Sequence, residues 1–461
     1  MWGGAGSFLN IYPGLRCINL PPFAHASGGI FLKRHYSFVW YCVAMATLSE
    51  ELRARGHVYQ FSTEKLEDIT DGEKRTLYLG VDPTADSIHA GNLAVYMLLR
   101  RFADAGHKII LLIGGGTALA GDPKPDVERT LTDPTVIAAR ADKLRSQAQK
   151  LLGGVEVTLV NNADWLTKLN LMEFLRDTGK FFTVNNLVKK DAISARMSSE
   201  EGISVTEFSY PLLQAYDYWH LFKQYGCDLQ IGGSDQWGNI IAGVDLIRKK
   251  ENKEVFALSC PLIIDKATGK KFGKSEGNAI WLDPQMTSPF KFYQFLFNTS
   301  DESVEDYLKL FTLLSLEDIK TAMDVHSRDK SERAAQRLLA RKVTELVHGE
   351  DAAESAQKLS EVLFGDSGVT ELSAEEAAQL SKEAPSCAVQ EGESILDVLV
   401  RSGLATSKRE ARQLLSDRAI QLNSETIGEP ERTVAASDFH NNVALLKKGK
   451  RSLAILTLSK K

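Results

Sequence analysis

The sequence predicts an α/β fold built on a doubly wound parallel sheet, and three features of the chain support this prediction. Short apolar stretches with strand-like patterning alternate with longer stretches whose apolar residues recur at helical spacing. Polar or glycine-rich turns follow the predicted strands, where an open parallel sheet places its ligand site. Further along, a helical pattern rich in leucine and alanine and then a basic tail predict an α-helical domain and a small α+β domain.

The composition is that of an ordinary globular protein. The chain has 461 residues, of which 43% are hydrophobic and 25% charged, and this length suits about two to four domains. No apolar run is long enough to span a membrane. The five cysteines show no CxxC or Cys/His metal-ligand spacing. We therefore expect free thiols in a reducing compartment and no metal held by protein ligands.

Residues 1–44 differ from the rest of the chain, because they contain no Asp or Glu and are rich in glycine, proline and aromatic residues. An apolar stretch at 36–46 resembles a signal core, but it lies too far from the N-terminus for an ordinary secretory signal. An acid-poor organelle transit peptide is a second interpretation. The third, which we favour, is that the natural chain starts at Met45. It predicts a cytoplasmic protein, with an organelle as the alternative.

The first strand and helix of the sheet are predicted at 76–82 and 89–106, with a turn between them. Ser87 or Asp86 is expected to cap the helix, which places His89 and Asn92 on one face of its first turn. A helix N-terminus carries free amide donors and partial positive charge, so this position suits a phosphate. A capped surface helix with an incidental histidine is the alternative.

The next elements extend the same pattern. A strand runs into the glycine-rich turn of "GGGTALAGDP", which lacks the dinucleotide and P-loop motifs. Helices are then predicted at about 134–152, 170–180 and 206–225, and strands at 155–162 and 228–233. Because the carboxyl ends of parallel strands meet at one edge, we expect "PTADSIHAGN", "GGGTALAGDP" and "GGSDQWGN" to lie together.

Two further segments carry polar side chains that need an explanation. In the helix at 206–225, Tyr210, Gln214 and Asp217 share one face beside apolar neighbours. A buried Asp217 requires a donor, and a purely structural network is the alternative. The loop "DKATGKKFGKSEGN" presents Lys271 and Lys274 among glycines. It is interpreted either as a mobile cationic flap for a polyphosphate or as a solvated hairpin tip.

Taken together, these motifs resemble one family. "HAGN" and "KFGKS" resemble the two signatures of the class I aminoacyl-tRNA synthetases, whereas "YLGVDPTADS", "EFSYPLLQAYD" and "IGGSDQWGNI" resemble the bacterial-type tyrosyl-tRNA synthetases. The resemblance covers about residues 45–461. It implies a Rossmann-like catalytic domain at 45–288, a helical domain at 289–365, a linker at 366–392 and a small RNA-binding domain at 393–461.

The resemblance also implies roles for particular residues of this chain. The residues implied in tyrosine binding are Tyr78, Asp122, Tyr210, Gln214, Asp217 and Gln236. Those implied in ATP binding are Asp82, Thr84, His89, Gly91, Asn92, Asp235, Lys271 and Lys274, with His89, Asn92 and the two lysines acting in catalysis. The implied partners are tyrosine, ATP with Mg²⁺ on its pyrophosphate, the tRNA for tyrosine and a second copy of the chain, with no membrane partner.

Two departures from the family pattern stand out. Asn92 replaces the second histidine of the signature and cannot become a cation, so its contribution to transition-state stabilisation is expected to be smaller. The loop after "GDP" reads "KPDVERT" and is about one residue shorter than usual, which leaves open whether Lys124 replaces the usual mobile lysine.

The tail from Ser394 is basic, with 12 lysines and arginines against 7 acidic residues in a chain of net charge -5. Lys408, Arg409 and Arg412 are expected on an exposed helical face that contacts tRNA phosphates, whereas a basic surface serving only solubility is the alternative. Two other functions stay open. A tryptophanyl-tRNA synthetase would not be expected to offer Tyr78 and Asp217 to an indole. An inactive RNA-binding paralogue would be expected to lose the flap lysines, which are intact.

Overall fold

The computed structural model describes residues 46–124, 127–130, 132–199, 202–275, 278–365, 367–449 and 452–459. It also describes the backbone of two short antiparallel strands, β1 (Leu15–Ile18) and β2 (Tyr41–Ala44). The rest of the N-terminal extension lies outside the described residues. The interpretation of residues 1–44 and the cytoplasmic location therefore stay predictions.

A six-stranded sheet forms the first half of the molecule, with strand order β3-β8-β7-β4-β5-β6. Its strands are β3 (Gln60–Phe61), β4 (Thr76–Val81), β5 (Lys108–Ile113), β6 (Val157–Asn161), β7 (Leu229–Gly233) and β8 (Phe256–Cys260). All pairs are parallel except the antiparallel edge pair β3-β8. After β4 the chain adds β5 and β6 on one side of that strand and later adds β7 and β8 on the other side. This order confirms the doubly wound prediction.

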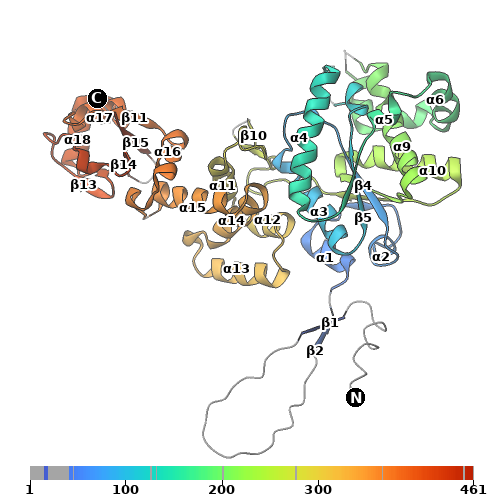
Figure 1. Cartoon of the computed structure of the whole chain (residues 1–461), viewed down its shortest axis with the longest axis horizontal. Helices are drawn as coiled ribbons and strands as arrows, with labels where there is room; N and C mark the ends of the chain where they lie inside the picture. The colour runs from blue at the N-terminus through green and yellow to red at the C-terminus, as the bar shows by residue number, and fades with distance from the viewer. Residues whose placement is uncertain are drawn as a thin grey trace, which may run out of the picture.

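Helices cover both faces of this sheet (Figure 1). The long ones are α3 (Leu93–Asp104), α4 (Pro134–Leu152), α9 (Val205–Tyr225) and α10 (Trp237–Glu251), with the shorter α1 (Leu48–Arg55) and α2 (Glu67–Thr70) near β3. Local signals set their ends. Ser204 caps α9 by accepting from the backbone N–H of Glu207, and Gly226 ends that helix in the left-handed conformation.

The predicted start of the first helix was wrong in detail. A short 3₁₀ turn, η1 (Ala90–Asn92), precedes α3, and His89 is the residue that caps it, through Nδ1 and the Gly91 N–H. Ser87 instead bonds Gln147 of α4, and Asp86 pairs with Arg140 of the same helix. These partners lie more than fifty positions away in the chain, so the local capping pattern did not reveal them.

The segment between β6 and α9 is also more broken than predicted. In place of one helix at about 170–180, α6 (Leu171–Asp177) is followed by the 3₁₀ turn η3 (Gly179–Phe181). Three further short helices lie nearby, namely α5 (Ala163–Leu166), α7 (Val184–Leu187) and α8 (Asp191–Met197). Each is only one or two turns long, too short for apolar periodicity to indicate a helix.

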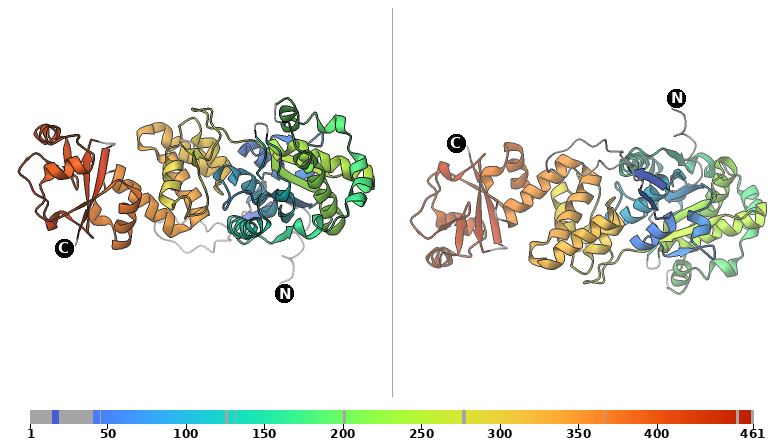
Figure 2. Two further views of the ribbon diagram at one scale, coloured as in Figure 1. Left: turned by 90° about the horizontal axis from the view of Figure 1, so that it is seen from above. Right: turned by 90° about the horizontal axis from the view of Figure 1, so that it is seen from below.

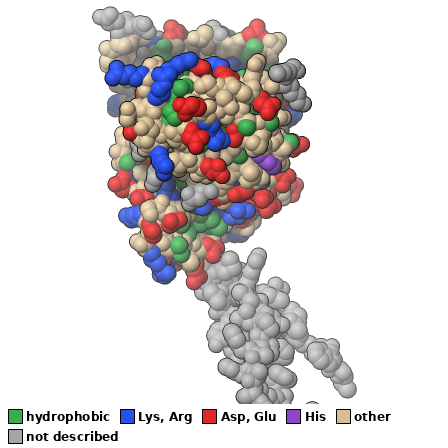
Figure 3. Space-filling model, turned by 90° about the vertical axis from the view of Figure 1, so that its left-hand side faces the viewer, with side chains coloured by type: hydrophobic (Ala, Val, Ile, Leu, Met, Phe, Trp, Pro, Cys, Tyr) green, Lys and Arg blue, Asp and Glu red, His purple; other side chains and the backbone are tan. Residues whose placement is uncertain are grey.

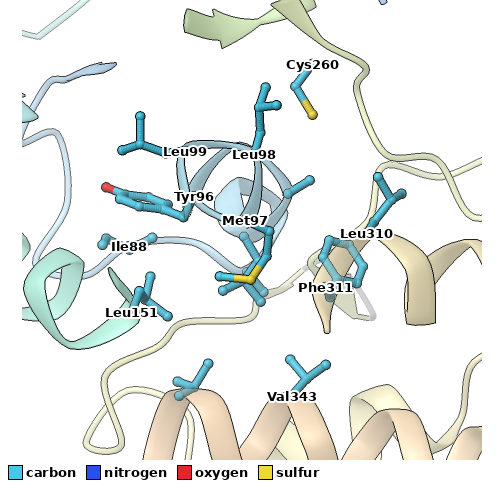
Figure 4. Close-up of a cluster of buried hydrophobic side chains, with 14 of the residues drawn as sticks. Ile88, Tyr96, Met97, Leu98, Leu99, Leu151, Cys260, Leu310, Phe311 and Val343 are labelled. Carbon is cyan, nitrogen blue, oxygen red and sulfur yellow. The ribbon is translucent and has the colours of Figure 1, made fainter. Parts of the chain in front are cut away.

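One hydrophobic core joins the sheet to the helical region that follows it. Figure 4 looks along α3, whose Met97 lies near Phe311 and above Val343, two residues of the helical region. The helical region consists of α11 (Pro289–Phe297), α12 (Val304–Phe311), α13 (Leu316–Arg328), α14 (Ala334–His348) and α15 (Glu350–Phe364). The three parts of the molecule follow one another along its long axis (Figure 2).

The linker expected at 366–392 is folded instead. It contains a 3₁₀ turn, η6 (Val369–Glu371), the helix α16 (Ala374–Glu383) and the strand β11 (Ser386–Val389). Ser373 and Glu376 form a capping box at the start of α16, and Leu380 is buried against Val443 and Ile455 of the C-terminal sheet. Glu371, Glu375 and Glu391 are exposed, and such acidic residues obscured this short apolar face in the sequence.

The C-terminal part is a five-stranded sheet of order β11-β15-β14-β12-β13, in which β11 pairs in parallel with β15. The other strands are β12 (Ile420–Leu422), β13 (Glu425–Ile427), β14 (Val443–Lys448) and β15 (Ser452–Leu458). Two helices, α17 (Ile395–Arg401) and α18 (Lys408–Ser416), cover it. Among the described residues, no helix is both long and apolar enough to cross a membrane.

Candidate active site

A cleft of about 320 Å³ opens at the carboxyl ends of β4, β7 and β8, where the sequence predicted the site. The switch from β4 to β7 leaves a crevice there, and the glycine-rich turn after β5 and one face of α9 line its sides. The structure brings together eleven of the predicted residues in its lining: Tyr78, Asp82, Thr84, Gly91, Asn92, Asp122, Tyr210, Gln214, Asp217, Asp235 and Gln236.

Asp217 is a buried carboxylate whose two oxygens each accept one hydrogen bond. Asn162 Nδ2 donates to Oδ2 at 2.8 Å, and Trp165 Nε1 donates to Oδ1 at 2.7 Å. Burial raises the pKa of Asp217 to about 8, against the opposing effect of these two donors. The hydroxyl of Tyr78 is also buried and has no partner among the described residues. The cleft therefore contains a carboxylate and an unpaired hydroxyl that a polar ligand group can satisfy.

Asp82 lies at the end of β4 and is held by two hydroxyls. Thr117 Oγ1 donates to Oδ1 at 2.7 Å, and Tyr210 donates to Oδ2 at 2.8 Å. Burial raises the pKa of Asp82 to about 6, despite both hydrogen bonds. The side chain is thus fixed in place from the glycine-rich turn on one side and from α9 on the other.

Asp122 follows the glycine-rich turn and is held from the start of α10. Gln236 Nε2 donates to Oδ2 at 2.8 Å and Asn239 Nδ2 donates to Oδ1 at 3.2 Å. Burial raises the pKa of Asp122 as well. Asp82, Asp122 and Asp217 therefore bring three acidic side chains with raised pKa values to one cleft, and a positively charged ligand group bound beside them would favour their ionised forms.

The loop after Asp122 is tied to α9 through Glu207, which also forms a buried ion pair with Arg196 of α8. Arg196 and Glu207 are each 2% exposed, and their charged groups approach to 3.1 Å. The other carboxylate oxygen of Glu207 accepts the backbone N–H of Arg129 at 2.9 Å, and Arg129 Nε donates to the carbonyl of Asp122 at 2.7 Å. Glu207 thereby links the helix that carries Tyr210 to the loop that carries Asp122.

The signature segment, His89–Asn92, packs directly against the base of the lysine-rich loop, which is the loop that carries Lys271 and Lys274. Ala90 N–H donates to the carbonyl of Ile280 at 2.8 Å, and the rings of His89 and Trp281 meet edge-on with centroids 5.6 Å apart. Phe272 is buried between the aromatic rings of the helical region, stacked on Phe311 at 4.6 Å. The loop base is thus anchored on both sides.

Of the three remaining predicted residues, His89 and Lys271 are not among the described residues that line the cleft. His89 lies behind Gly91, whose N–H it accepts. Lys271 is exposed at the loop. Lys274 begins the two-residue strand β9 (Lys274–Ser275), which pairs with β10 (Asn278–Ala279), and its side chain lies outside the described residues.

Comparison with known proteins assigns the family. The profile of the class I tRNA synthetases (W and Y) matches residues 70–365, and that of the tyrosine–tRNA ligase SYY-like C-terminal domain matches residues 376–456. The chain belongs to the class I tRNA synthetases of the W and Y family. ATP is a substrate of tRNA synthetases in general, as the sequence resemblance implied.

Individual relatives of this synthetase extend over most of the chain. A tyrosine–tRNA ligase of Roseiflexus castenholzii is 44% identical over 426 residues, which are 90% of this chain and 100% of that protein. One from Lactobacillus johnsonii is 43% identical over 428 residues, with the same two coverages of 90% and 100%. A C-terminally truncated mitochondrial tyrosyl-tRNA synthetase of Aspergillus nidulans superposes with a TM-score of 0.64 at 33% identity, covering 70% of this chain and 95% of that one.

The C-terminal domain of this synthetase presents the predicted basic residues on α18. Ala411 and Leu415 face the core, whereas Lys408, Arg409 and Arg412 are exposed. Lys408 Nζ pairs with Asp397 of α17 at 2.5 Å. Figure 3 shows that this end of the molecule carries lysine and arginine side chains interspersed with acidic ones.

Several residues of the synthetase site were missed from the sequence, namely Thr117, Asn162, Trp165, Gln230 and Asn239. Some signals were available. Asn162 ends a predicted strand and Trp165 lies three residues beyond it, at the edge where ligand residues collect. Gln230 is a lone glutamine inside an apolar strand, and its buried Oε1 has no partner among the described residues.

Proposed function

We propose that this chain is a tyrosine–tRNA ligase, which activates tyrosine with ATP and then transfers it to the terminal ribose of its tRNA. The pair of Tyr78 and Asp217 carries the proposal. A phenol hydroxyl can donate to the Asp217 carboxylate and accept from the unpartnered Tyr78 hydroxyl in a single contact. The indole N–H of tryptophan can only donate, and phenylalanine offers neither group.

The remaining carboxylates support an amino-acid substrate. We place the ammonium group of tyrosine against Asp122, Tyr210 and Gln214, since the buried Oε1 of Gln214 has no partner among the described residues and can accept. Asp82 adds negative charge nearby, and Gln236 lies beside Asp122, close to where the substrate carboxylate would lie. A zwitterion bound this way directs its carboxylate toward the signature segment.

ATP fits on the other side of the cleft. We assign Asp82, Thr84, Gly91, Asn92 and Asp235 to it from their place in the lining, with His89 supporting Gly91. The tyrosine carboxylate attacks the α-phosphorus directly, so catalysis consists of positioning and charge stabilisation. Lys271 and Lys274 would neutralise the leaving pyrophosphate from the loop.

Magnesium is part of the proposal as a companion of ATP. No group of three or more His, Cys, Asp or Glu side chains in the described part of the chain is arranged to hold a metal ion. Magnesium commonly binds through substrate phosphates, waters and one or two carboxylates. We therefore expect it to be held mainly by the phosphates, adding charge neutralisation to that of the two lysines.

Amino-acid-dependent ATP/pyrophosphate exchange across the standard amino acids tests the proposal. Tyrosine alone should support strong exchange, and equal exchange with tryptophan would refute the assignment. Lys274→Ala should lower the activation rate by roughly 10- to 10³-fold and leave tyrosine binding unchanged, because a loop lysine acts on the transition state.

We also propose that the ligase is a homodimer. Large apolar side chains are exposed on the short helices between β6 and α9 and at the start of α9 itself: Leu171 at 68%, Met172 at 70%, Val184 at 62%, Met197 at 54% and Val205 at 81%. Exposed apolar residues gathered in one region are typical of a protein interface. Val205→Glu should shift the sedimentation of the protein to that of a monomer, whereas a substitution at the distant, exposed Val325 should not.

The basic face of α18 is the proposed contact for tRNA phosphates. Lys408, Arg409 and Arg412 are exposed on one side of the helix, whose other side is packed on the C-terminal core. Replacing Arg409 and Arg412 with glutamine should weaken tRNA binding and reduce its salt dependence, since each phosphate contact releases counterions. Unchanged binding at several salt concentrations would exclude this surface.

A further inference from the structure

Trp165 holds one oxygen of Asp217, yet its own element does little to fix the indole. The residue lies on α5, a helix of four residues whose N-cap makes no side-chain hydrogen bond. Its side chain is only partly buried. The direction of the N–H that reaches Asp217 at 2.7 Å therefore depends on what packs against the ring.

The other donor to Asp217 is held independently. Asn162 is completely buried, its Oδ1 accepts the Gly116 N–H at 2.7 Å, and its Nδ2 also donates to Thr117 Oγ1 at 2.9 Å. The glycine-rich turn thus fixes Asn162 by hydrogen bonds of its own. Among the described contacts, Trp165 has no comparable set of hydrogen bonds. The two donors to Asp217 therefore differ in what orients them.

His220 stacks on the ring of Trp165, which also packs against the buried cluster that contains Ile110 and Leu112. Its imidazole lies face to face with the indole, with ring centroids 4.2 Å apart and planes inclined by 17°. It stands on α9 three residues after Asp217, so the stacked ring and the carboxylate share one side of that helix. Burial lowers the pKa of His220, and the stacked ring is therefore neutral near pH 7.

We propose that His220 is a positioning residue for the recognition of the substrate hydroxyl. Its ring holds the Trp165 indole in the plane from which Nε1–H reaches Asp217, and the carboxylate stays directed at the phenol. The inference rests on the proposed tyrosine specificity. Phenylalanine has no hydroxyl that could bond Asp217. Loss of the stack should therefore weaken the binding of tyrosine and leave that of phenylalanine unchanged.

Three single variants test this role. His220→Ala removes the ring, His220→Phe keeps a flat ring, and Lys223→Ala removes an ion pair with Glu251 one turn further along α9. The measurements are kcat and KM of pyrophosphate exchange with tyrosine and with phenylalanine, normalised by active-site titration. In His220→Ala we expect the KM for tyrosine to rise roughly 3- to 10-fold, the range set by one aromatic pair. Its kcat and the phenylalanine reaction should not change. The other two variants should retain the wild-type discrimination.

An equal loss with tyrosine and phenylalanine, or a His220→Phe enzyme as impaired as His220→Ala, would overturn the inference. A double-mutant cycle provides the second criterion. Trp165→Phe removes the N–H donor, so adding His220→Ala to it should cost no further discrimination, whereas additive losses would contradict the mechanism. A wild-type enzyme that does not activate tyrosine would refute the proposed function itself, which separates the two failures.

Discussion

Gly273 is the point where the lysine-rich loop touches the signature segment, and its replacement by alanine gives the sharpest test of that contact. Its backbone has φ +87°, and an added Cβ would lie 2.4 Å from Cε1 of His89 and 2.8 Å from the backbone nitrogen of Gly91. The left-handed conformation alone costs a non-glycine residue about 1–2 kcal/mol. That cost corresponds to roughly 5- to 30-fold in the population of the docked loop, at about 1.4 kcal/mol per factor of ten.

Gly269 offers a matched control in the same loop. It also has a positive φ, +67°, but a Cβ there would meet nothing within 4 Å. Gly269→Ala therefore carries the backbone strain without the contact. We expect Gly273→Ala to lower the rate of tyrosine-dependent pyrophosphate exchange by roughly 10- to 100-fold, strain and steric overlap together. Gly269→Ala should lower the exchange rate clearly less than Gly273→Ala.

Single-turnover activation and equilibrium tyrosine binding are the measurements that separate the two effects. Tyrosine binding should be unchanged in both variants, because Tyr78 and Asp217 lie away from the loop. If Gly273→Ala matches Gly269→Ala in rate, the close approach to His89 has no role in activation. If tyrosine affinity falls together with the rate, the substitution has disturbed the whole cleft.

Three further outcomes follow from the site and the domain contacts. The KM for tyrosine should rise as the pH falls below about 6, because Asp82 then becomes protonated and loses the charge that attracts the ammonium group. A KM for tyrosine that stays constant down to pH 5 would contradict this role of Asp82. Asn92→His should speed activation by roughly 2- to 10-fold, since a histidine can carry positive charge to the phosphates, and single-turnover rates at pH 6 and 8 check it. Ending the chain at Gly365 should preserve tyrosine-dependent exchange and sharply reduce tRNA charging, whereas charging at the full-length rate at physiological salt would show that the C-terminal domain is dispensable.

The packing of α16 and β11 determines where the chain should be cut. A chain ending near Gly392 would keep α16 and β11 but lose β15, the strand that pairs with β11. Leu380 would then lose its packing against Val443 and Ile455. Misfolding caused by this exposed surface would be mistaken for a loss of tRNA binding. Gly365 follows α15 and lies before these elements, although it leaves Leu363 of the shared cluster uncovered.

The sequence alone determined the class of fold and the edge at which the site lies. Apolar periodicity predicted the long helices well, with α4 at 134–152 as expected and α9 starting within one residue of the expected position. The spacing of Tyr210, Gln214 and Asp217 placed them on one face, and all three line the cleft. These features depend on neighbours within about four positions of each other in the chain, which a sequence displays directly.

Only the tertiary structure decided which groups satisfy the buried carboxylates. Asn162 and Trp165 lie 55 and 52 positions from Asp217 in the chain, and Thr117 lies 35 positions from Asp82. The same holds for β11, which joins a sheet whose partner strand β15 begins more than sixty residues later. A buried polar group needs a partner of the right chemistry but sets no distance along the chain at which that partner must occur. The requirement was therefore visible in the sequence, and the partner became visible only when the sheet brought the strand ends together.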